Sequence, residues 1–103
     1  MAKYRVVRDK YVRYGNGGVI TSTFEAENDL DAILKVDENC GYGYPFDEDD
    51  EGNAIMPTLE DAISHLSANN GDGADFVFKV ENVATGEVIF EEDDGYIENE
   101  EDW

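Results

Sequence analysis

Acidic side chains outnumber basic ones by 26 to 7 in this chain of 103 residues, which leaves a formal net charge of −19. Self-repulsion of this size opposes a compact state, so folding requires a substantial apolar core. Apolar residues make up 41% of the chain, which argues against global disorder. The length suits one domain with one hydrophobic core.

The charge is unevenly distributed along the chain. Residues 1–24 carry five bases and one acid, whereas residues 25–103 carry twenty-five acids and two bases. Nucleic acid and anionic membrane surfaces repel such a chain, and basic proteins or cations attract it. We interpret the early bases as sheet residues that pair with acids elsewhere in the fold.

The N-terminal third predicts a β-hairpin followed by a helix. Strands are expected over 3–14 and 18–26, joined by the turn "GNGG", with Ile20, Phe24 and Ala26 on one face. Asn28 can cap a helix over 29–37. Residues 39–57 are too rich in glycine and charge for regular structure, so the sequence predicts a loop there.

The second half predicts another helix and another hairpin. Thr58 and Asp61 have the spacing of a capping box, and Leu59, Ala62, Ile63 and Leu66 form the apolar stripe of the helix. The stretch "ADFVFKVENVATGEVIF" predicts a hairpin in which Phe76, Phe78 and Val80 share one face. The expected fold is α+β: a ββααββ order, with two helices on one face of an antiparallel sheet. The expected domain spans residues 1–92, and residues 93–103 form an acidic tail.

Metal and cofactor sites are not expected. With Gly52 at the sixth position of a calcium loop, Asp47, Asp49 and Glu51 fall at positions 1, 3 and 5, but Thr58 stands where the bidentate glutamate belongs. One cysteine and one histidine at unrelated places do not make a zinc site.

Catalysis is not expected either. Cys40 is interpreted as a free thiol in a reducing cytoplasm, and His65, which lies off the helical stripe, as a solvent-facing residue. The chain lacks the motifs of a serine nucleophile or a phosphate-binding loop. It also lacks an apolar run long enough for a membrane span and an apolar signal peptide.

Three acidic clusters remain, each beside aromatic residues that can anchor an interface. In an extended strand, carboxylates at nearly every position approach the charge density of a nucleic-acid strand. A basic groove that binds phosphates would attract them. Solvated loop charges are the plain alternative. The candidate partner-binding residues are Asp47, Glu48, Asp49, Asp50, Glu51, Glu91, Glu92, Asp93, Asp94, Glu98, Glu100, Glu101, Asp102, Tyr44, Phe46 and Tyr96.

In size, charge and clusters such as "DEDDE" and "EEDD", the chain resembles small acidic phage-encoded proteins that mimic nucleic acid. These include anti-CRISPR proteins, anti-restriction proteins and inhibitors of DNA-repair enzymes. The resemblance implies a stoichiometric inhibitor in the bacterial cytoplasm. It would occupy the basic nucleic-acid-binding groove of a defence protein, a CRISPR effector first and a restriction enzyme second, without itself contacting nucleic acid or membrane.

Two other readings stay open at this point. Halophilic proteins carry dense surface acid, although that pressure should spread acid evenly rather than bunch it. An assembly or regulatory protein with an acidic tail is the second alternative. A homo-oligomer is compatible with each reading, since the basic strand leaves room for a dimer contact.

Overall fold

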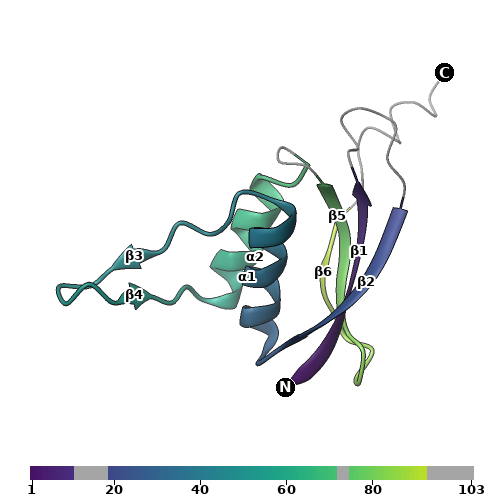
Figure 1. The fold of residues 1–103 in the computed structure, drawn as a ribbon, viewed down its shortest axis with the longest axis horizontal. Helices are drawn as coiled ribbons and strands as arrows, with labels where there is room; N and C mark the ends of the chain where they lie inside the picture. The colour runs from purple at the N-terminus through teal and green to yellow at the C-terminus, as the bar shows by residue number, and fades with distance from the viewer. Residues whose placement is uncertain (11–18, 72–74, 93–103) are drawn as a thin grey trace.

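The computed structural model describes residues 1–10, 19–71 and 75–92. Its elements are β1 (Ala2–Lys10), β2 (Val19–Ala26), α1 (Asp29–Cys40), β3 (Asp47–Glu48), β4 (Ala54–Ile55), α2 (Leu59–Ala68), β5 (Asp75–Asn82) and β6 (Val88–Glu91). The four long strands form an antiparallel sheet in the order β2-β1-β5-β6. Both helices lie on one face of this sheet (Figure 1). The protein has an α+β fold, and the expected ββααββ order is confirmed apart from a small hairpin, β3–β4, between the helices.

Local sequence signals set the beginnings of both helices. The side chain of Asn28 accepts the N–H of Asp31 at 2.8 Å, and the Thr58 hydroxyl accepts the N–H of Asp61 at 3.1 Å. Each contact satisfies one backbone donor that the first helical turn leaves unpaired. The first helix continues to Cys40, three residues beyond the expected end. No helix within the described residues has the length and apolar character needed to cross a membrane.

The core lies between the sheet and the helices. Its main cluster joins Val6 of β1, Val77 and Val80 of β5 and Phe90 of β6 to the inner faces of α1 and α2. From the helices come Ile33, Val36, Ala62 and Leu66, all nearly inaccessible to solvent. Burying a side chain of this type contributes about 1.5–3 kcal/mol, so the core offsets much of the cost of the chain's self-repulsion.

The expected alternation along β5 is wrong. Between Val7 and Arg8 the pairing of β1 with β5 skips Phe78, because Val7 lies opposite Lys79 and Arg8 lies opposite Val77. This β-bulge puts Val77 and Val80 in the same core cluster although they are three residues apart. Phe76 and Phe78 therefore do not share a face with Val80, and their rings contact each other edge to face at 5.3 Å.

The faces of β2 are confirmed, since exposure alternates along the strand with Thr21, Thr23 and Glu25 outward. The turn after β5 also lies where expected, and Asn82 stabilises it by accepting the N–H groups of Ala84 and Thr85. Three expectations fall outside the described residues: the "GNGG" turn, the strand beyond Lys10 and the tail at 93–103.

Candidate functional site

The expected loop at 39–57 is wrong in its central part, because the acidic run forms a β-hairpin. Asp47 pairs with Ile55 and Glu48 with Ala54. The hairpin and its flanks, residues 46–56, are here called the acidic arm. Figure 1 shows the acidic arm extending from the helices on the side away from the sheet. Every residue of the acidic arm is exposed.

Asp49 organises the tip of the acidic arm. Its Oδ1 accepts the N–H groups of Glu51 and Asn53, each at 2.9 Å, and its own N–H donates to the carbonyl of Asn53. Gly52 closes the turn at φ +84°, a left-handed conformation that disfavours side chains. The backbone donors of Asn53 and then Glu51 lower the pKa of Asp49 below its ordinary value. Asp49 is therefore both part of the turn and a fixed negative charge.

The turn changes the shape of the predicted charge array. Only Asp47 and Glu48 lie in a strand, while Asp49, Asp50 and Glu51 form the turn. The five carboxylates thus form a compact cluster at a projecting tip, instead of the extended row that the sequence suggested. Among the described residues, none of the five forms an ion pair, so the cluster keeps its charge.

Apolar side chains accompany the charged cluster. Phe46, Ile55 and Met56 are 42%, 50% and 59% exposed, among the most exposed large apolar residues of the described chain. Phe46 and Met56 also line a depression of about 700 Å³ beside α1, together with Leu34, Tyr42 and Tyr44. Exposed apolar groups next to charges are typical of interaction sites, where the apolar groups supply most of the binding energy.

The base of the acidic arm is attached to a buried Asp–His pair. Asp37 of α1 is inaccessible to solvent, and its Oδ2 lies 2.5 Å from Nδ1 of His65 on α2. The His65 ring contacts Tyr44 edge to face at 5.2 Å, and Tyr44 contacts Phe46 at 5.3 Å. This chain of contacts connects both helices to the first residue of the acidic arm.

The expectation of a solvent-facing His65 is therefore wrong. Its side chain is 21% exposed, and its acidic partner lies 28 residues away in the sequence. The sequence held one signal that Asp37 is buried. Asp37 follows Ile33 by four residues and precedes Cys40 by three, so it occupies the buried stripe of α1. A carboxylate in such a position requires a partner. The pair binds two helices together, and the structure brings no nucleophile into contact with His65 within the described residues.

Of the other acidic candidates, the structure describes only Glu91 and Glu92, and neither belongs to the acidic arm. Glu91 is exposed on β6, across the helices from the arm (Figure 1). The Glu92 carboxylate accepts hydrogen bonds from Ser67 of α2 and from Asn70, so it ties the end of β6 to the helical layer. Asp93, Asp94, Tyr96, Glu98, Glu100, Glu101 and Asp102 lie outside the described residues.

Two basic residues of β1, Arg5 and Arg8, pair with acids elsewhere in the fold, as interpreted from the sequence. Arg5 contacts Glu81 at 2.8 Å and Arg8 contacts Asp75 at 2.7 Å, both across to β5. Lys35 contacts Asp31 at 3.3 Å on α1. The hydrogen bond from Arg5 lowers the pKa of Glu81, and the Glu27 backbone N–H followed by Lys35 lowers that of Asp31. These bases neutralise acids of β5 and α1, not those of the acidic arm.

In the ranges 1–10, 19–71 and 75–92, no three His, Cys, Asp or Glu side chains gather as metal ligands. Asp49, a position in the calcium-loop pattern, directs its carboxylate oxygen to backbone donors of the turn. Comparison with protein-family models, curated proteins and solved structures finds no match to this chain.

Proposed function

We propose that the protein is a stoichiometric inhibitor that binds the basic nucleic-acid-binding groove of a bacterial protein, with the acidic arm as the contact. The single observation that carries the proposal is the placement of five exposed carboxylates, without ion pairs to the described residues, at a projecting tip with exposed apolar neighbours. A groove built for phosphates attracts such a tip through the same lysine and arginine side chains.

The distribution of bases supports a directed surface over a uniformly acidic one. Arg5, Arg8 and Lys35 are engaged by acids on the sheet and on α1. Attraction to a basic partner is therefore expected to be strongest at the acidic arm, where none of these three bases competes. The hairpin and its anchor at Tyr44 and His65 limit the conformations of the tip, which reduces the entropy lost on binding.

The proposal is tested with an arm variant that changes charge and keeps the turn. It combines Asp47→Asn, Glu48→Gln, Asp50→Asn and Glu51→Gln, and leaves Asp49 to accept its two backbone donors. A control variant removes the same number of charges outside the acidic arm and its neighbouring depression, through Glu27→Gln, Glu60→Gln, Asp61→Asn and Glu87→Gln, all at exposed positions.

Each immobilised variant is exposed to nuclease-treated bacterial lysate, and retained proteins are identified by mass spectrometry. Wild type and control variant are expected to retain the same nucleic-acid-binding protein, and the arm variant to lose it. Equal retention by the arm variant would contradict a role for the acidic arm. Retention of proteins without affinity for nucleic acid would contradict mimicry.

A further inference from the structure

Within the described residues, β2 is an edge strand of the sheet. The N–H of Val83 donates to the carbonyl of Lys3 at 3.0 Å, so the backbone N–H and C=O groups of Lys3 point toward β5. The backbone groups of the next residue, Tyr4, therefore point the opposite way, toward Phe24 of β2. Because this direction alternates along a strand, the backbone N–H and C=O groups of Thr21, Thr23 and Glu25 point away from β1. Lys35 occupies the Glu25 carbonyl at 2.9 Å, while no hydrogen bond within the described residues engages the backbone of Thr21 or Thr23.

Within the described residues, this edge lacks the usual protection against pairing with another strand. β2 is eight residues long, contains neither lysine nor proline, and pairs with β1 without a register shift. The opposite edge differs, since β6 has four residues and its pairing with β5 contains a register shift. Of the two edges, β2 is the one able to accept a further strand over its length.

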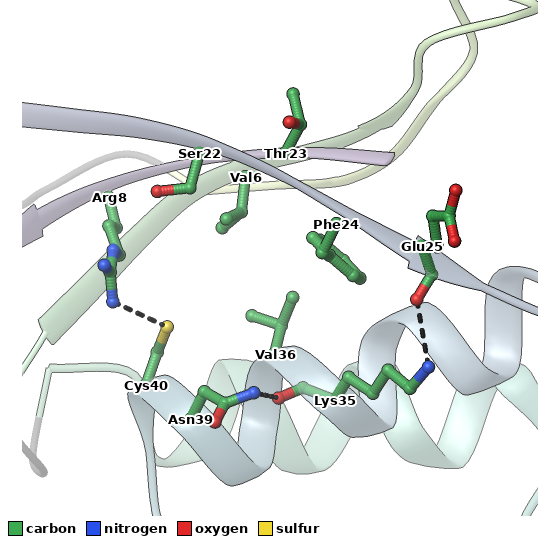
Figure 2. A pocket seen from close by; sticks show the side chains of 10 residues that line it. All are labelled: Val6, Arg8, Ser22, Thr23, Phe24, Glu25, Lys35, Val36, Asn39 and Cys40. Atoms are coloured by element: carbon green, nitrogen blue, oxygen red, sulfur yellow. Dashed lines mark hydrogen bonds between the residues drawn. The ribbon is translucent and has the colours of Figure 1, made fainter. Parts of the chain in front are cut away.

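A cavity of about 210 Å³ lies directly beneath this edge, between β2 and α1. Val6, Phe24 and Val36 point into it, with Ser22, Asn39 and Cys40 at its margins, as Figure 2 shows. Cavities of about 150 Å³ accept a benzene ring, so this one accommodates one aliphatic or aromatic side chain. A strand added to β2 would direct every second side chain toward it, on the face that Phe24 and Ser22 share.

Charge favours a basic occupant. Arg8 and Lys35 also line the cavity, but each is paired with an acid of this chain, Asp75 and Asp31 respectively. Glu25 is exposed on the other face of β2, where a neighbouring strand would place its alternate side chains. A second copy of this chain would bring the same net charge of −19 to the interface, whereas a basic segment is attracted by it.

We propose that the β2 edge and the cavity beneath it bind an extended basic peptide segment of a partner protein, which pairs with β2 and inserts an apolar side chain between Phe24 and Val36. The segment alternates apolar and basic residues, the apolar ones toward α1 and the basic ones beside Glu25. Main-chain hydrogen bonds at Thr21 and Thr23 supply affinity, and the cavity supplies specificity. This site is separate from the acidic arm and does not depend on its function.

The test uses the full-length ¹⁵N-labelled chain and a synthetic eight-residue peptide of alternating valine and lysine. A matched peptide carries N-methyl groups on alternate residues, which preserve its charge and remove backbone donors. The first peptide is expected to shift the Thr21 and Thr23 amide resonances and to slow their hydrogen exchange, and the methylated peptide to bind at least about tenfold more weakly. Shifts confined to Asp47–Glu51 would overturn the proposal, since they report only general attraction to acid.

A variant pair tests the protein side. Thr23→Pro removes an outward N–H that β1 does not use, a position where an edge strand tolerates proline, and Thr23→Val retains that N–H. Thr23→Pro is expected to lose the peptide and Thr23→Val to bind it. Equal binding by both, or concentration-dependent broadening at Thr21 and Thr23 without peptide, would overturn the proposal, the latter in favour of a second copy. If Thr23→Pro fails to fold, the methylated peptide on the wild-type chain decides.

Discussion

At the scale of single residues, the Asp37–His65 pair is the feature with the largest consequence for stability. Asp37 is inaccessible to solvent, and its Oδ1 has no hydrogen-bond partner among the described residues, so the contact of Oδ2 with His65 is its main compensation. The same pair orients Tyr44 at the base of the acidic arm. Its loss would therefore affect both the packing of the helices and the position of the arm.

His65→Ala is expected to lower the free energy of unfolding by about 3 kcal/mol, because it leaves a buried carboxylate without a partner. Asp37→Ala and the double variant complete a double-mutant cycle, measured by urea unfolding followed by circular dichroism. A coupling free energy of about 1–3 kcal/mol is expected between the two side chains. Additive effects would mean that the pair does not act as a unit.

Tyr4 makes stability depend on alkaline pH. Burial, and then the hydrogen bond to Asp29 at 2.7 Å, raises the pKa of Tyr4 from 10.0 to about 12. Between these values the folded state keeps a proton that the unfolded chain releases, so stability is full below pH 10 and falls as pH rises toward 12. Tyr4→Phe keeps the ring that stacks on Phe24 and removes this component. Urea unfolding at several pH values should show a steeper alkaline loss for wild type, and parallel curves would contradict the assignment.

At the scale of elements, local chemistry in the sequence predicted most of the fold. Asn28 and Thr58 mark the helix beginnings because a cap depends on residues only three apart. The hairpin after β5 and the faces of β2 also follow from short-range patterns. The hairpin of the acidic arm was missed because its strands have two residues each, although Asp49 and Gly52 carried the signal of a turn.

Features that depend on distant segments were not predictable in this way. The bulge at Phe78 arises from how β5 pairs with β1, and a pattern of period two cannot reveal it. The end of α1 depends on Gly41, where a Cβ atom would lie 3.1 Å from Oδ1 of the buried Asp37. The sequence also could not show that Glu91 belongs to β6 and that Glu92 accepts hydrogen bonds from Ser67 and Asn70, away from the acidic arm.

At the scale of the whole molecule, acid and base occupy different regions. Arg5 and Arg8 of β1 are engaged on the sheet, whereas the acidic arm carries five carboxylates without ion pairs among the described residues. In the proposed complex, long-range attraction to the basic partner would act on the whole chain, and the tip would determine where contact forms. Competition with nucleic acid is the property that separates such an inhibitor from a generally acidic protein.

The most direct test measures displacement of fluorescently labelled duplex DNA from the partner retained in the lysate experiment, by anisotropy at several salt concentrations. Wild type and the four-charge control variant are expected to release the DNA at one equivalent. The arm variant should require at least about tenfold more protein, and rising salt should weaken release steeply. A complex that holds the protein, the partner and the DNA together, or release that is independent of salt and of the arm charges, would contradict the account.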